Sequence, residues 1–273
     1  MAWKVRSTAP RTASTTSAGS RPVSFFEFFL SFFAMVAPVY VPVNAPATIH
    51  LRPHEEVAER VLLPGDPGRA LRLAQLLLEK PKMLNHNRGL WGYSGVAGDG
   101  EALTIQSTGM GGPSAAIVLE ELIDLGARRI VRVGTCGALA DELGLGELLV
   151  ASGVLAEDGT SRALGADGTL RPDADLHAAL RAAAPEAAEG LVASSDLFYD
   201  PDPGRARGWV EAGALAVDME AATLLAVAGR RGVAAAVVLA VSDVVASGAR
   251  IAHDALERAE AELGRAGLAA LAA

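Results

Sequence analysis

The apolar run at residues 233–241 constrains the fold of this chain more strongly than any other segment. Its sequence, VAAAVVLAV, contains no polar side chain, and such a run predicts a strand that is buried on both faces. Strands of this kind are typical of parallel sheets that helices cover on both sides. The preceding residues, 219–231, are nearly all apolar and predict a buried helix. Arg230-Arg231-Gly232 would be a favourable C-terminus for this helix.

Strand and helix patterns alternate along most of the chain and define the expected fold class. Asp66 is a suitable N-cap and Pro67 fits the first position of a helix that follows the first strand. The alternation favours a three-layer α/β domain with a central, mostly parallel, mixed sheet flanked by helices. We expect these further elements: strands at 60–64, 129–135, 147–155, 191–195 and 214–217, paired strands at 88–94 and 101–107, and a last helix at about 252–268.

Ligand sites in such sheets lie beyond the carboxyl ends of the strands, and notable motifs stand at several of these ends. Gly65 follows the first predicted strand, and Thr135 closes another. Ser242 and Asp243 follow the apolar run. We therefore expect these residues to lie near one ligand site.

Charge and composition narrow the classes of function. The chain of 273 residues has a net charge of −8, which argues against a nucleic-acid-binding surface but leaves room for a few arginines that bind a small anion. The single cysteine, Cys136, excludes an internal disulfide and suits a reducing compartment. The five histidines show no spacing typical of metal ligands, so we expect no metal site.

A glycine-dense turn at residues 107–112 joins a strand-like run to a helix. Glycines allow a ligand to approach the backbone closely, and a helix N-terminus offers free N–H groups and the positive end of the helix dipole. The turn is therefore either an anion site or simply a tight connection. Apolar residues of the helix recur at the spacing of one buried face: Ala115, Val118, Leu119 and Leu122.

Arg132 lies inside a strand that should be buried, within the sequence IVRVG. A buried guanidinium needs a charged partner. The partner could be structural, namely Glu220 or Glu121, or it could be a phosphate that the planar fork of the arginine holds. The sequence PGDPGR at residues 64–69 is a second candidate anion turn, and it favours the phosphate interpretation.

Carboxylates occur at two further places, and each could have either a structural role as a helix cap or a role in binding or catalysis. Asp218 and Glu220 begin a helix, where they could cap it or accept hydrogen bonds from two vicinal hydroxyl groups. Asp243 ends the apolar run after Ser242. A partly desolvated carboxyl there could supply a proton near neutral pH, or it could be the N-cap of the next segment.

Taken together, the motifs resemble those of the nucleoside phosphorylase family, which includes hexameric bacterial purine nucleoside phosphorylases and uridine phosphorylases. The resemblance extends from about Ala47 to the C-terminus. The matching motifs occur in this order: ATIH at 47–50, PGDPGR at 64–69, NRG at 87–89, STGMGGPSAAI at 107–117, RVGTCG at 132–137, DLFY at 196–199, VDMEAA at 217–222 and VSD at 241–243.

The resemblance implies a phosphate site and a nucleoside site. Glu220 would hold the ribose hydroxyls, Phe198 would stack on the base, and His50 would reach the ribose 5′-hydroxyl of an adjacent subunit. Where this chain has Asp218, the family usually has glutamate. The phosphate ligands would be Gly65, Arg69, Arg132 and Thr135, with Arg88 from a neighbouring subunit. The nucleoside contacts would be His50, Met110, Phe198, Val217, Asp218, Met219, Glu220 and Ser242.

The resemblance also implies a reaction, the phosphorolysis of purine nucleosides. Inorganic phosphate would attack the anomeric carbon of a ribonucleoside or deoxyribonucleoside, and Asp243 would be the catalytic acid that protonates N7 of the base. In the family a downstream arginine assists this aspartate, and Arg250 and Arg258 are the candidates here. No cofactor is expected beyond phosphate as co-substrate. The expected partners are further copies of the chain, in a hexamer built as a trimer of dimers, with no nucleic acid and no membrane.

Residues 1–45 carry none of these motifs and differ in composition from residues 46–273, the expected catalytic domain. Basic residues and a Ser/Thr-rich stretch precede an apolar run at residues 25–34, an order that resembles a secretory signal. The run is too short for an ordinary membrane span and includes Glu27. Because the expected catalytic domain resembles cytoplasmic enzymes, we expect a cytoplasmic protein with a disordered or artefactual extension, and Met35 could be the true start of translation.

Three alternative functions remain open. A uridine phosphorylase would share the phosphate site but would not be expected to use an acid such as Asp243 on the base. A nucleoside hydrolase of the same fold would lack the phosphate arginines, Arg69 and Arg132. A protein that binds nucleosides without turning them over would differ only in its activity. The sequence does not distinguish 6-amino from 6-oxo purines.

Overall fold

The computed structural model describes residues 48–273, so the expected extension at residues 1–45 lies outside the described residues. The strands are β1 (Arg60–Leu63), β2 (Leu78–Asn85), β3 (Gly92–Ala97), β4 (Ala102–Gln106), β5 (Arg129–Ala138), β6 (Leu148–Ala156), β7 (Thr169–Leu170), β8 (Ala188–Ser194), β9 (Ala214–Asp218), β10 (Ala234–Val244) and β11 (Ala249–Arg250). The helices are α2 (Pro67–Leu77), α3 (Gly112–Asp124), α4 (Gly159–Ala163), α5 (Ala174–Ala183), α6 (Pro203–Glu211), α7 (Ala221–Arg231) and α8 (His253–Ala272), with a 3₁₀ turn η1 (Asn87–Gly89).

These strands form one mixed sheet whose centre is parallel. β4 pairs with β1, β1 with β5, and β5 with β10, all in parallel, and β3 and β2 continue antiparallel beyond β4. On its other side, β10 pairs with β6, β6 with β8, β8 with β9, and β9 again with β5. These pairings close into a ring, which brings the end of β9 beside the ends of β5 and β10.

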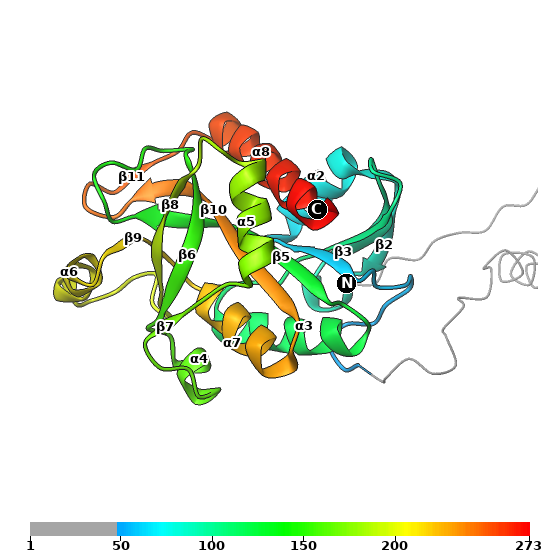
Figure 1. The fold of residues 1–273 in the computed structure, drawn as a ribbon, viewed down its shortest axis with the longest axis horizontal. Coiled ribbons are helices and arrows are strands. Elements are labelled where there is room, and N and C mark those ends of the chain that lie inside the picture. Colours follow the sequence, from blue (N-terminus) through cyan, green and yellow to red (C-terminus); the bar gives the residue numbers. More distant parts are fainter. Residues whose placement is uncertain (1–47) are drawn as a thin grey trace, which may run out of the picture. The chain divides into compact units, whose positions relative to one another are not determined.

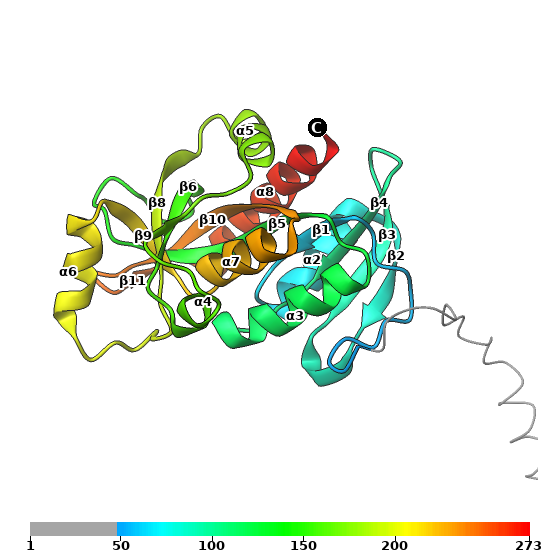
Figure 2. The ribbon, with the colours of Figure 1, turned by 60° about the horizontal axis from the view of Figure 1, so that its bottom comes forward.

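Helices cover both faces of the sheet, as Figures 1 and 2 show. α3 and α7 pack against each other on one face, and α2, α5 and α8 lie on the opposite face. Successive residues of β5 point into different apolar clusters, Ile130 toward the α3–α7 side and Val131 toward the α2–α8 side. The expected three-layer α/β architecture is confirmed. Within residues 48–273, no helix has the length and apolar character that crossing a bilayer requires.

Local sequence signals fix several helix ends as predicted. The Asp66 side chain caps α2 by accepting a hydrogen bond from the backbone N–H of Arg69 at 2.6 Å, and Pro67 occupies the first turn. α7 ends at Gly232, which has the left-handed φ of +64° that glycine adopts without strain.

Two central strands run further than the apolar pattern predicts. β5 continues to Ala138 and β10 to Val244. Ser242 and Asp243 therefore lie within β10 rather than after it, and Thr135 lies inside β5 rather than at its end, which corrects the expected boundaries. Backbone pairing continues after the apolar residues stop, with a register shift in β10 between Val241 and Asp243.

Two element boundaries next to predicted site residues, Arg88 and Met219, also differ from the prediction. The strand expected at 88–94 begins only at Gly92, because residues 87–89 form η1, in which Arg88 has a left-handed φ of +59°. The helix expected from residue 219 begins at Ala221, because β9 continues to Asp218.

Candidate functional site

Two glycine-containing turns lie side by side at the ends of β1 and β4. The backbone N–H of Thr108 donates to the carbonyl of Pro64 at 2.9 Å, and the N–H of Gly109 donates to the carbonyl of Gly65 at 3.0 Å. Gly109 and Gly111 have φ values of +73° and +85°, which residues with a side chain adopt only with strain. The two anion turns predicted from the sequence are therefore one continuous surface of backbone.

Glu220 connects this surface to the buried Arg132. One carboxylate oxygen accepts from the N–H of Gly111 at 2.5 Å, and the other accepts from Nη2 of Arg132 at 2.5 Å. Nε of Arg132 donates to Asp218 at 3.0 Å. Gly134 makes room for the guanidinium, since a Cβ there would stand 2.8 Å from its central carbon. The structural ion pair considered for Arg132 therefore exists with Glu220, and not with Glu121.

The guanidinium of Arg132 can donate more hydrogen bonds than the described residues accept. Its Nη1 atom is buried and has no hydrogen-bond partner among the described residues. Burial alone would lower the pKa of Arg132, but the charges of Glu220 and Asp218 outweigh burial and raise it, so the group stays cationic. A buried donor without a partner is unfavourable, and an anionic ligand would supply the acceptor.

The two carboxylates beside Arg132 have different surroundings. Burial raises the pKa of Glu220, and the charge of Arg132 and the N–H of Gly111 oppose that rise. Asp218 has no exposed side-chain surface. It accepts from Ser194 Oγ at 2.5 Å and from the N–H of Ala221 at 3.0 Å. The structure therefore leaves Asp218 no free surface for the nucleoside contact that the sequence suggested, and Asp218 supports Arg132 instead.

Arg69 is the second predicted phosphate arginine, and its structural partner was missed. Its Nε donates to Glu260 of α8 at 2.8 Å, and its Nη1 donates to the carbonyl of Val133 at 3.4 Å. Arg72 shares the same carboxylate. Glu260 is buried, as is Arg69. Glu260 lies in the sequence RAEAEL of α8, on the apolar side of an amphipathic helix. An acid at such a position was the one feature of the sequence that could have indicated a buried partner for Arg69.

Asp243 lies at a second polar corner, close to the ends of β5 and β9. Its Oδ1 accepts from Ser242 Oγ at 2.8 Å, and its Oδ2 would be 3.0 Å from a Cβ on Gly137. Gly137 pairs with both Asp243 and Val217. Asp243 is half-buried. Because Asp243 lies inside β10 and the N-cap position of α8 is Ala252, Asp243 is not an N-cap, and the structural alternative for this residue is wrong.

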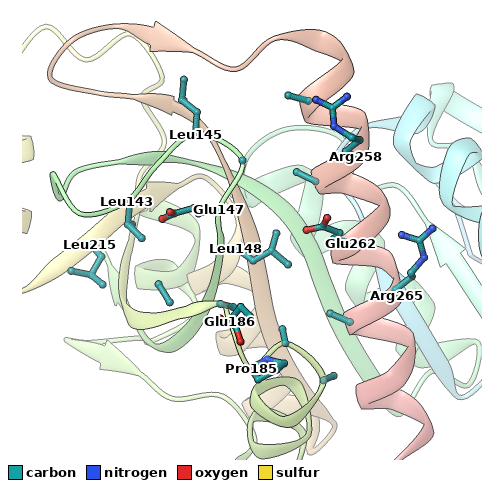
Figure 3. A pocket seen from close by; sticks show the side chains of 18 of the residues that line it. Leu143, Leu145, Glu147, Leu148, Pro185, Glu186, Leu215, Arg258, Glu262 and Arg265 are labelled. Carbon is teal, nitrogen blue, oxygen red and sulfur yellow. The ribbon is translucent and has the colours of Figure 1, made fainter.

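The structure separates the two arginines considered as helpers of Asp243. Arg250 is paired with Asp243 across the β10–β11 hairpin, and its guanidinium lies 5.8 Å from the centre of the Phe198 ring. Arg258 instead donates to Asp254 and lines a groove of about 970 Å³ between α8, the 142–148 loop and the 183–188 turn (Figure 3). No residue predicted for the phosphate or nucleoside site lines that groove.

The remaining predicted residues fall into two groups. Phe198 is 55% exposed and Met110 is 86% exposed, whereas Val217, Met219 and Thr135 are half-buried. Exposed apolar side chains beside the polar cluster fit ligand contacts better than core positions.

His50 and Arg88 lie together, but away from the Arg132 cluster. The carbonyl of His50 accepts from Asn87 Nδ2 at 2.8 Å, next to Arg88. His50 itself contacts Glu121 at 2.7 Å. Glu121 is nine residues along α3 from Gly112, a distance of about 14 Å along the helix. The chain therefore does not bring His50 and Arg88 to its own Arg132.

The candidate site is a polar corner, formed by Arg132 and the two glycine turns, with exposed apolar side chains such as Met110 beside it. In the described residues, no group of three or more His, Cys, Asp or Glu side chains is placed to hold a metal ion. Residues 59–272 match the family model described as the phosphorylase superfamily, and the chain belongs to that family.

Relatives of known function support the same grouping. A DeoD-type purine nucleoside phosphorylase of Caldanaerobacter subterraneus is 36% identical over 210 residues, which cover 74% of this chain and 90% of the relative. One from Geobacillus kaustophilus is 37% identical over 201 residues, or 71% of this chain and 84% of the relative. A guanosine phosphorylase of Halorubrum lacusprofundi is 37% identical over 198 residues, or 71% and 81%.

Proposed function

We propose that the chain is a purine nucleoside phosphorylase, a pentosyltransferase that converts a purine nucleoside and inorganic phosphate to the free base and a pentose 1-phosphate. The names of its relatives, several purine nucleoside phosphorylases and a guanosine phosphorylase, support this function. The observation that carries the proposal most directly is that Nη1 of Arg132 is buried and has no hydrogen-bond partner within residues 48–273.

Phosphate binds where Arg132 meets the glycine turns. Nη1 of Arg132, the backbone at Gly65 and the hydroxyl of Thr135 supply donors, and Arg69 adds positive charge. The carboxylates of Asp218 and Glu220 hold the guanidinium in place, with hydrogen bonds on Nε and Nη2, so that its remaining edge is preorganised for the anion.

The nucleoside lies between the phosphate and Asp243. Glu220 accepts hydrogen bonds from the ribose hydroxyls, Met110 and Met219 pack on the sugar, and Phe198 stacks on the base. As the glycosidic bond breaks, the sugar gains oxocarbenium character, which the adjacent phosphate charge stabilises. Asp243 gives its proton to N7 of the departing purine, and Arg250, across the hairpin from Asp243, is the arginine that assists it.

Phosphate dependence is the first test. Inosine, adenosine, guanosine and uridine are incubated with and without phosphate, and the products are separated by chromatography. We expect free purine base and pentose 1-phosphate only with phosphate, because phosphate is the nucleophile whose oxygen replaces the base on the anomeric carbon. Equal base release without phosphate would indicate a nucleoside hydrolase, and preference for uridine would indicate a uridine phosphorylase. Binding without turnover, seen as a thermal shift alone, would indicate a nucleoside-binding protein.

Assembly is the second test. We propose a homo-oligomer, a hexamer built from dimers, in which His50 and Arg88 complete the site of a neighbouring copy. Their distance from Arg132 within one chain supports this arrangement, as does the exposure of Ile49 at 69% and Trp91 at 37% nearby. Light scattering on the active enzyme should give at least a dimer. An active monomer would remove His50 and Arg88 from the site.

We also propose a cytoplasmic location. Cys136 is a free, buried thiol, and burial raises its pKa, so it is neither a disulfide partner nor a reactive nucleophile. Phosphate is the only co-substrate that the proposed reaction requires.

A further inference from the structure

Glu121 of α3 holds the backbone that carries His50. Its Oε2 accepts from the N–H of Leu51 at 2.6 Å, and its Oε1 accepts from the N–H of Ile49 at 3.2 Å. The N–H of His50 lies 3.1 Å from both oxygens. A single carboxylate therefore binds three consecutive backbone N–H groups. Such a set of donors fixes both the path and the orientation of the segment.

The same carboxylate also contacts the imidazole of His50. Nδ1 lies 2.7 Å from Oε1 of Glu121. Because a carboxylate only accepts hydrogen bonds, Nδ1 carries the proton. In the neutral ring Nε2 is then the acceptor, and it is free to receive a hydrogen bond from a hydroxyl group. Glu121 thus selects the tautomer as well as the position of the ring.

Glu121 stays ionised in this position. Burial works to raise the pKa of Glu121, but the donors from Leu51, His50 and Ile49 outweigh burial and lower it. The side chain of Glu121 is 13% exposed, and that of His50 is 26% exposed. The pair is therefore shielded enough to be well ordered, while the imidazole keeps an accessible edge.

The hydrogen bonds continue from His50 to the turn that carries Arg88. Asn87 Nδ2 donates to the carbonyl of His50 at 2.8 Å, and Asn85 Oδ1 accepts from the N–H of Arg52 at 2.9 Å. Arg88 is held in its left-handed conformation within this turn. At the other end of α3, the N–H of Gly111 donates to Glu220. α3 therefore contacts the chain's own site at its start and the His50 segment near its end.

We propose that Glu121 is a positioning residue for catalysis, which aims Nε2 of His50 at the 5′-hydroxyl of a nucleoside bound by a second copy of the chain. The inference rests on the proposed function, because it assumes phosphorolysis and an oligomeric site. Glu121 itself does not touch the substrate. It acts through the backbone and the imidazole of His50.

The test compares Glu121→Gln with Glu120→Gln, using inosine and 5′-deoxyinosine as substrates. Glutamine keeps the shape of Glu121 but replaces one acceptor oxygen with an amide donor, which faces N–H groups. Glu120 is the matched control, since it lies next along α3 and pairs on the surface with Arg231. Each variant is assayed for phosphorolysis with steady-state kinetics.

We expect Glu121→Gln to raise KM for inosine about tenfold, the effect of losing a charged hydrogen bond, with kcat changed less than twofold. With 5′-deoxyinosine, which lacks the hydroxyl, the variant and the wild type should have the same KM. Glu120→Gln should match the wild type on both substrates. If Glu121→Gln does not fold, Glu121→Asp, which keeps the charge with a shorter reach, should show the same dependence on the 5′-hydroxyl.

The possible failures are distinguishable. A wild type without phosphate-dependent activity would overturn the proposed function and this inference together. An active wild type whose Glu121→Gln variant has an unchanged KM for inosine would overturn the inference alone. An equal loss on inosine and 5′-deoxyinosine would do the same, because it would show a structural role that does not pass through the 5′-hydroxyl.

Discussion

Replacing Asp243 with asparagine should lower kcat on inosine and guanosine by roughly 10²–10⁴-fold, the usual contribution of general-acid catalysis. A purine leaves poorly as an anion, and a proton on N7 removes that difficulty. Asparagine keeps the shape of the side chain and the contact with Ser242, but it has no proton to give up. The KM for phosphate should change little, because Arg132 and the glycine turns are untouched.

The control substrate for this variant is 7-methylguanosine. Its base already carries the positive charge that protonation would create, so Asp243→Asn should turn it over at nearly the wild-type rate. Asp254→Asn, at an exposed aspartate paired with Arg258, is the matched control protein and should behave as the wild type. Equal losses on inosine and 7-methylguanosine would mean that Asp243 only shapes the site.

Replacing Arg132 with lysine should raise the KM for phosphate by about 10- to 100-fold, because a lysine cannot reproduce the planar fork that holds an anion and two carboxylates at once. Arg132→Ala should abolish most of the activity at ordinary phosphate concentrations. It should also destabilise the fold by about 3–5 kcal/mol, because Asp218 and Glu220 would remain buried without a counter-charge.

Steady-state kinetics at varied phosphate and chemical denaturation together check the predictions for Arg132. Arg60→Lys is the control, since Arg60 forms a surface pair with Asp99 outside the site. If Arg132→Lys folds and keeps the wild-type KM for phosphate, then Arg132 is only a structural ion pair, and the phosphate site must be sought elsewhere.

Local sequence information predicted the core elements of the fold. The run at 233–241 became most of the buried part of β10, because a short apolar run rich in valine packs well in a central strand that is covered on both faces. Asp66, Pro67 and Gly232 fixed helix ends through contacts within a few residues. Strand β2 at residues 78–85 was not predicted, since most of its side chains are exposed and they do not alternate between apolar and polar as in a typical strand.

Only part of the candidate site was predicted from the sequence. The glycine turns and Arg132 were visible, because glycine density and a charge inside an apolar strand are local anomalies. The role of Asp218 was not visible. From sequence it looked like a second contact for the nucleoside, and its burial beneath Arg132 depends on Ser194 of β8, which lies far away in the chain.

The sequence by itself determined the buried central strands, the start of α2 at Asp66 and the end of α7 at Gly232, and which residues are chemically out of place. Those properties depend on neighbours within about one turn of helix or one strand. Only the tertiary structure decided the long-range pairs: Arg69 with Glu260, Phe198 with Arg250, and His50 with Glu121. Each pair joins segments whose distance along the chain is unrelated to their distance in space. The reason is that strand order and helix packing, rather than local patterns, set which side chains meet.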